Sequence, residues 1–186
     1  MNQNTELKSE TGLSTKIIPI KKFFVYSIFS LGLFQFYFGY KIWKEIKEEK
    51  NLDIYPIMRC IFFPLFSGSL ARHINKMAEE KEYTKSINSM IVFLGCFIGN
   101  SINRKAHFPF DLMGLLIIIG VLIPVIQAYN FYWLQKEPNL KPNTKFSPTG
   151  IFIIILGIII TLLSAIPENY LDSTNNNKIE IQDDNN

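Results

Sequence analysis

The chain has 186 residues and a net charge of +3, and its charged residues stand in short blocks between long apolar runs. A charge this small and this scattered excludes the concentrated basic face that nucleic-acid binding requires. The two cysteines lie among apolar residues, which excludes a disulfide framework and a metal knuckle. With 48% hydrophobic residues gathered into runs, the sequence predicts an all-α integral membrane bundle of four transmembrane helices plus one interfacial or re-entrant amphipathic helix.

The first apolar run predicts where the membrane domain begins. Residues 1–20 are expected to form a flexible polar leader, and residues 21–167 a single membrane domain. A span is predicted at about 23–43, because no formal charge lies between Lys22 and Lys41 and about 20 residues suffice to cross a hydrocarbon core of about 30 Å. This run is longer than the core of a secretion signal, so we expect it to be retained.

Two glycines and a glutamine stand out within that predicted span. Gly32, Gln35 and Gly39 fall at i, i+3 and i+7, so they would share one face of a continuous helix. Such a face lets another backbone approach closely, and Gln35 could hydrogen-bond across it. We interpret it as a helix-packing surface, with a polar substrate path as the alternative.

Residues 54–77 are apolar on one side, but they contain Arg59 and are interrupted by Pro56 and Pro64. An amphipathic helix that lies in the membrane interface, with Arg59 reaching the headgroups, explains this pattern. The alternatives are a re-entrant helix whose Arg59 faces an anionic substrate, or a further crossing of the membrane. The expected apolar stripe consists of Met58, Ile61, Phe62, Leu65, Phe66, Leu70, Ile74 and Met77.

Three more spans are predicted, at about 87–102, 111–134 and 149–166. Gly95 and Gly99 are four residues apart in the second span, a spacing that allows backbone-to-backbone helix contact. Gly150 and Gly157 follow a heptad spacing in the last span and predict another helix-packing seam.

Gln127 and Asn130 lie three apart near the end of the third predicted span. Together with Arg59 they are candidate polar or headgroup contacts. They could form a polar site, although hydrogen-bonding to the backbone around Pro124 and to the interface is the commoner role of such residues.

The acidic tail, residues 168–186, is expected to be disordered because it is rich in Asn and lacks an apolar period. With four spans, twelve basic residues share one side of the membrane and seven lie on the other. The excess of basic residues on the inner side then places the tail outside the cytoplasm. A fifth crossing would change only the side of the N-terminus.

Residues 22–47, 56–74 and 124–130 together resemble a family of small uncharacterised bacterial multi-pass membrane proteins. Residues 22–47, KFFVYSIFSLGLFQFYFGYKIWKEIK, resemble that family's "TLGLYxxYWFYKNWKxIK"-type first span, with soft aromatic exchanges at Phe34 and from Phe38 to Tyr40. Residues 56–74, PIMRCIFFPLFSGSLARHI, are similar to its "P..RA.F.PLF..SLF..I" stretch, and Pro124 to Asn130 to its second half. The resemblance implies a bacterial inner-membrane location and no assigned activity.

These patterns favour a structural or interaction component of the membrane that contacts the lipid bilayer. The glycine seams also allow contact with a second copy of the chain or with another membrane protein. The alternative is a small transporter or channel with Arg59, Gln35, Gln127 and Asn130 along a polar path. No catalytic residue, metal ligand or cofactor is predicted, because His73 and His107 are isolated and no paired carboxylates face each other on a span.

Overall fold

The computed structural model describes residues 13–14, 16–105, 110–142 and 148–164. These residues form an all-α fold with one minimal pair of strands, β1 (Leu13–Ser14) and β2 (Lys141–Pro142), which run parallel. The helices are α2 (Ile20–Phe29), α3 (Leu33–Lys50), α4 (Pro56–Ile61), α5 (Phe63–Glu79), α6 (Ser89–Lys105), α7 (Phe110–Lys136) and α8 (Pro148–Ser164). The expected tail, residues 168–186, and most of the expected leader lie outside the described residues.

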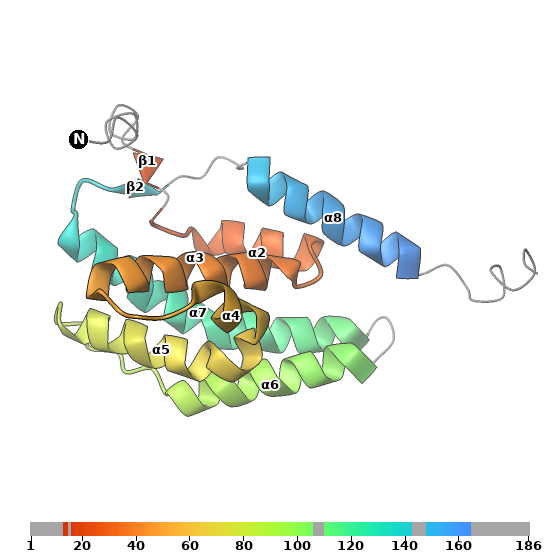
Figure 1. Ribbon diagram of the computed structural model, residues 1–186, viewed down its shortest axis with the longest axis horizontal. Helices are drawn as coiled ribbons and strands as arrows, with labels where there is room; N and C mark the ends of the chain where they lie inside the picture. The colour runs from red at the N-terminus through yellow and green to blue at the C-terminus, as the bar shows by residue number, and fades with distance from the viewer. Residues whose placement is uncertain (1–12, 15, 106–109, 143–147, 165–186) are drawn as a thin grey trace, which may run out of the picture.

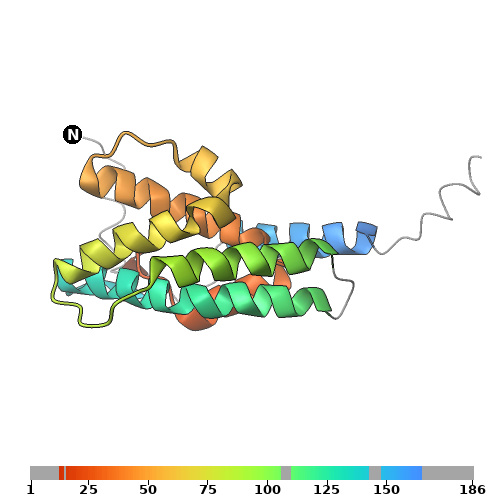
Figure 2. The same cartoon turned by 90° about the horizontal axis from the view of Figure 1, so that it is seen from below.

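The helices lie roughly along one long axis and form hairpins (Figure 1). Helices α2 and α3 are antiparallel neighbours, and α6 and α7 form a longer antiparallel pair that Figure 2 shows side by side. Helix α5 packs against α3, α6 and α7, while α8 contacts α2 and α3. The turn between α2 and α3 lies toward the end of the bundle where α6 finishes and α7 begins, and the C-terminal ends of α3, α5 and α7 lie at the opposite end (Figure 1).

The stretch predicted as one span over 23–43 is instead two helices. Leu31 and Gly32 adopt positive φ values of 48° and 90°, which end α2 and reverse the chain. The turn pairs its own N–H groups: Ser30 N–H donates to the Tyr26 carbonyl at 3.0 Å, and Gly32 N–H donates to the Ser27 carbonyl at 3.0 Å. Ser30 Oγ accepts the Phe34 N–H at 2.9 Å, and this caps the start of α3.

This break changes the interpretation of the predicted glycine face, because Gly32 is no longer on the same helix as the residues that follow it. Gly32 forms the turn, and Gln35 is 4% exposed beside it. Gly39 lies in α3 against the ring of Phe63, where a Cβ would come within 2.6 Å. Gly32, Gln35 and Gly39 therefore serve a turn, a buried polar contact and a helix contact rather than one continuous face.

Residues 54–77 are also broken, at Phe62, into α4 and α5. Pro64 stands at the start of α5, where a missing N–H is tolerated. The predicted apolar stripe does not stay on one side: Leu70 and Ile74 are buried in the bundle, while Met58 and Leu65 are more than half exposed. A single straight helix over 54–77 is therefore not what forms, and two helices that meet at Phe62 replace it.

The later helices begin and end within three residues of the predicted bounds wherever the structure describes them. Gly95 lies against Val121, where a Cβ would come within 2.5 Å, and a Cβ on Gly99 would meet the Gly114 carbonyl oxygen at 2.6 Å. Small residues thus let α6 and α7 approach closely. Helix α8 uses its two glycines in the same way. Gly150 lies against the Tyr26 ring and Gly157 against the Ser30 backbone, so α8 rests on the α2–α3 turn.

The bundle is apolar both inside and outside. Its core includes Phe23, Phe38, Trp43, Leu70, Ile118 and Tyr129. The outer face of α6 carries Met90, Ile91, Leu94, Phe97 and Ile98, each at least 45% exposed, and α8 exposes Ile151, Phe152, Ile155, Leu156, Ile158, Ile159 and Ile160. An apolar surface of this extent is unusual on a water-soluble monomer and marks a contact with membrane or protein.

Among the described residues, one helix is both long and apolar enough to cross a membrane, Leu112–Lys136, and half of its most apolar window is buried inside the protein. The apolar stretches of α6 and α8 are shorter than this. One such helix is consistent with membrane association, and it does not by itself establish four crossings.

Replacing Gly32 with alanine should lower the free energy of unfolding by about 1–2 kcal/mol, because a Cβ is strained at a φ of +90°. The nearest atom to that Cβ would be Gln35 Nε2 at 3.3 Å, so backbone conformation is the main cause. The thermal midpoint in detergent measures the effect. Gly120→Ala is the control, since a Cβ there meets nothing within 4 Å and alanine favours the helix by up to about 1 kcal/mol. An equal loss of stability in Gly32→Ala and Gly120→Ala would contradict the view that Gly32 is needed for its backbone conformation.

Candidate functional site

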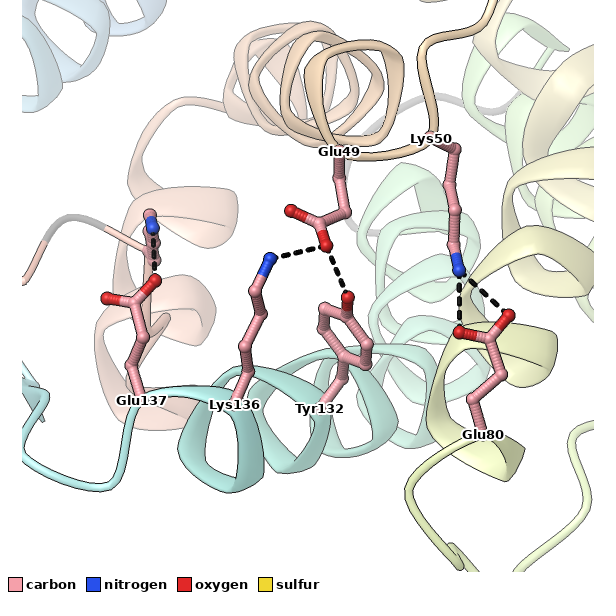
Figure 3. Close-up of polar contacts among 7 residues, drawn as sticks. Glu49, Lys50, Glu80, Tyr132, Lys136 and Glu137 are labelled. Carbon is pink, nitrogen blue, oxygen red and sulfur yellow. Dashed lines mark hydrogen bonds and ion pairs between the residues drawn. The ribbon is translucent and has the colours of Figure 1, made fainter.

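The polar side chains gather at the end of the bundle where α3, α5 and α7 finish (Figure 3). Lys136 Nζ donates to Glu49 at 2.5 Å, and Lys50 Nζ donates to Glu80 at 2.6 and 2.8 Å. These contacts join α3 to α7 and to the end of α5. We call this group, together with Lys16, Tyr132 and Glu137, the charged end.

The N-terminal segment is fixed to the charged end, although residues 16–19 fall within the predicted flexible leader. Asn130 binds the backbone of Ile18 twice: its Nδ2 donates to the Ile18 carbonyl at 2.7 Å, and its Oδ1 accepts the Ile18 N–H at 2.8 Å. Lys16 pairs with Glu137 at 2.6 Å, and Ile17 and Ile18 are buried. This part of the leader prediction is wrong, because the apolar pair at 17–18 and the distant amide of Asn130 dock it.

Two carboxylates on α3 accept hydrogen bonds from tyrosines on α7. Glu45 accepts the hydroxyl of Tyr129, and Glu49 accepts the hydroxyl of Tyr132 at 2.6 Å. Lys44 and Glu48, four residues apart on α3, form an ion pair at 3.9 Å along their own helix, whereas Glu45 and Glu49 bind another helix. Sequence periodicity cannot reveal those partners, which lie more than 80 positions away.

The charge of Glu49 is stabilised in the folded protein. Partial burial alone would raise the pKa of its carboxyl group, but the hydrogen bonds from Lys136 and Tyr132 outweigh that effect and hold the pKa below its ordinary value of 4.5. This arrangement makes Glu49 the centre of a clamp between α3 and α7.

Arg59 lies away from this clamp, on α4. Its guanidinium carbon stands 4.3 Å from the centre of the Trp43 ring on α3 and 5.5 Å from the centre of the Phe66 ring on α5. Its Nη1 is buried and has no hydrogen-bond partner among the described residues. Trp43 is fully buried, and its indole N–H also lacks an acceptor within the described part of the chain.

The four residues considered for a polar path have different surroundings. Gln127 is exposed on α7, and Asn130 turns to the N-terminal segment. Gln35 is buried beside the α2–α3 turn, with its Nε2 unpartnered among the described residues, and Arg59 is packed on Trp43. These neighbours do not form one lining.

The described residues contain no group of three or more His, Cys, Asp or Glu side chains placed to hold a metal ion. Cys60 is half-buried on α4 and Cys96 is buried on α6, and both are free thiols. The polar groups that the structure brings together are therefore ion pairs, hydrogen-bonded tyrosines and one aromatic-bound arginine.

Comparisons of this chain with models of known protein families, with curated proteins and with solved structures find no match. The family resemblance of residues 22–47 and 56–74 stays a prediction. Function is therefore inferred from the geometry of the chain.

Replacing Asn130 with alanine should release the N-terminal segment, because the Ile18 backbone would lose both hydrogen bonds at a cost of about 1–3 kcal/mol. Hydrogen exchange of a peptide covering residues 16–22 should become faster by about tenfold or more. Gln127→Ala, on the same helix but exposed, should leave that exchange unchanged. Unchanged protection in Asn130→Ala would show that the amide does not hold the segment.

Replacing Glu49 with glutamine should destabilise the protein by roughly 1–2 kcal/mol at about pH 7 and change its response to acid. Because the folded pKa of Glu49 lies below 4.5, its stabilising contribution is present above that pH and is lost as pH falls through the folded pKa. The stabilities of the wild type and the variant should therefore converge at acidic pH, once the pH lies below the lowered folded pKa of Glu49. Glu80→Gln removes an ion pair whose glutamate is 54% exposed, so its effect should stay within about 1 kcal/mol. A larger effect at Glu80 than at Glu49 would argue against the clamp.

Proposed function

We propose that this chain is a multi-pass integral membrane protein of the bacterial inner membrane that acts as a structural or interaction component and carries out no catalysis. In this proposal α6, α7 and α8 cross the bilayer. The hairpins α2–α3 and α4–α5 enter it from the charged end and return to the same side. The observation that carries the proposal is the combination of outward apolar faces on uncharged helices with a charged end confined to one side of the bundle.

The outer surfaces of the crossing helices support contact with lipid. No formal charge lies in α8, between Ser89 and Asn103 in α6, or between Leu112 and Gln135 in α7. The side chains that α6 points outward are Met90, Ile91, Leu94, Phe97 and Ile98, where a helix on a water-soluble protein would carry polar residues. Lipid tails are the surroundings that accept such a face without cost.

The α2–α3 turn has the property that a re-entrant turn needs. Backbone groups that face hydrocarbon without a partner cost several kcal/mol each, so non-helical backbone at membrane depth survives only where protein surrounds it. Here Ser30 and Gly32 satisfy the turn internally, and Gly157 of α8 covers it. Leu115 of α7 lies on another side of Gly32. The turn thus contacts two of the proposed crossing helices, and Leu31 within it is 42% exposed.

This topology strengthens the charge asymmetry. Because both hairpins return to the charged end, the N-terminal lysines join the twelve basic residues already placed there. The other side keeps three of the nineteen basic residues, which are Arg104, Lys105 and Lys178. The excess of basic residues at the charged end supports its placement in the cytoplasm, with the acidic tail outside. A single crossing at 23–43 would instead separate the N-terminus from Lys44.

The outer face of α8 supports the interaction role. This helix rests on the bundle through Gly150 and Gly157, and most of its remaining surface is isoleucine, leucine and phenylalanine. A helix held by small residues on one side presents a smooth apolar face on the other. That face suits lipid or the helix of a membrane-protein partner.

A transport path is the weaker proposal. It would require Arg59, Gln35, Gln127 and Asn130 to line a common cavity, and their neighbours are different parts of the protein. Asn130 already uses both ends of its amide on Ile18.

Single-cysteine labelling in intact spheroplasts tests the topology. In a background with Cys60→Ser and Cys96→Ala, a membrane-impermeant maleimide should label Ala106→Cys from outside. It should label Thr5→Cys and Asn51→Cys only after the membrane is permeabilised, because the proposal puts both positions in the cytoplasm.

Each alternative topology gives a different labelling pattern. Labelling of Thr5→Cys from outside, with Asn51→Cys protected, would restore a single crossing at 23–43 and contradict the hairpin. Recovery of the full chain in the soluble fraction, with none in the membrane fraction, would contradict the proposed function as a whole.

A further inference from the structure

Two cation–ring pairs link α3 to the segment that leads into α4. Arg59 stacks on Trp43, and Lys47 lies 5.9 Å from the Tyr55 ring while donating to the Ile54 carbonyl at 2.8 Å. Lys47 follows Trp43 by one helical turn toward the charged end, and Tyr55 precedes Arg59 by four residues. Arg59 therefore lies one turn farther from the charged end than Lys47 does.

Two aromatic rings lie beside the Arg59 guanidinium, and its N–H groups have no acceptor among the described residues. A guanidinium has five N–H donors in its plane, and a ring stacked on it accepts none of those in-plane hydrogen bonds. No carboxylate pairs with Arg59 among the described residues, and its Nη1 is buried without an acceptor. Leaving a buried charged N–H group without a hydrogen-bond acceptor costs free energy, so binding of an acceptor from outside the protein is favoured.

The surroundings of Arg59 favour an acceptor that belongs to a lipid. Tyr55, Met58, Phe62 and Leu65, which are close to Arg59 in the chain, are each at least 47% exposed and offer an apolar surface that acyl chains can cover. Phosphate oxygens match the guanidinium fork in a bidentate manner. Lys47, one turn nearer the charged end, adds positive potential where a headgroup would lie.

We propose that Arg59, held between Trp43 and Phe66, binds the phosphate of a membrane phospholipid on the side of the charged end. This inference rests on the proposed membrane location. It differs from simple snorkelling, because the arginine is held by rings from α3 and α5 and one lipid is bound at a defined site.

Native mass spectrometry of the full chain in mild detergent tests the proposal. The wild type should retain one phospholipid, and Arg59→Ala should bind phospholipid about tenfold to hundredfold more weakly, the loss expected when hydrogen bonds to a charged group are removed. Arg59→Lys keeps the charge but not the fork, so its affinity should lie between the two. Arg72→Ala removes an exposed arginine from α5 and should bind as the wild type does.

Tryptophan fluorescence separates the possible sources of the phosphate. In a Trp133→Phe background, the emission of Trp43 in delipidated protein should change with phosphatidylglycerol and should not change with diacylglycerol of the same chains. A response to inorganic phosphate at an equal concentration would overturn the assignment to a lipid.

Equal phospholipid retention by wild type and Arg59→Ala would overturn the site, as would an equal response to diacylglycerol. Unchanged binding in Arg59→Lys would overturn the bidentate geometry. The thermal midpoint of each variant shows whether it is folded. Membrane fractionation of the same variants keeps failure of this site distinct from failure of the proposed function.

Discussion

The satisfaction of backbone hydrogen bonds in the turn between α2 and α3 is the constraint on which the rest of the structure depends. The apolar run at the start of the chain is long enough to cross a bilayer, and the turn at Ser30 to Gly32 sends it back instead. Because the N–H groups from Ser30 to Phe34 all donate to acceptors within α2 and the turn, these donors need no water. Helix α8 can then pack directly on it through Gly157. The return of the chain also brings Glu45 and Glu49 to the tyrosines of α7.

The sequence was sufficient for the all-α class and for the approximate positions of α6, α7 and α8, because long apolar runs between charged blocks predict helices directly. It was insufficient to predict the turn between α2 and α3 or the break at Phe62 between α4 and α5. The sequence marks Gly32 only as a small residue, because its positive φ depends on the turn that it forms with Ser30 and Leu31. At Phe62 neither glycine nor a change of apolar period marks the break, and Pro64 two residues later is the only local signal.

The candidate residues were predictable by type more than by role. Gly95 and Gly99 lie at the helix contact that their spacing predicts, because a four-residue spacing fixes a helix face without knowledge of the partner. Asn130 was selected for its polarity at membrane depth, yet its partner is the backbone of Ile18, 112 positions away. Arg59 was expected to reach outward as a long cation. Its packing on Trp43 depends on the fold of α4 against α3, which no local pattern contains.

The two hairpins that return to the charged end have a consequence for the membrane itself. In the proposed topology the leaflet on that side accommodates α2 to α5 in addition to the crossing helices, whereas the opposite leaflet surrounds few helices besides α6, α7 and α8. The protein then has a larger cross-section in one leaflet than in the other and is wedge-shaped. A bilayer packs around a wedge most easily where it curves toward the narrower side. Many copies gathered together would therefore favour a curved patch of membrane over a flat one.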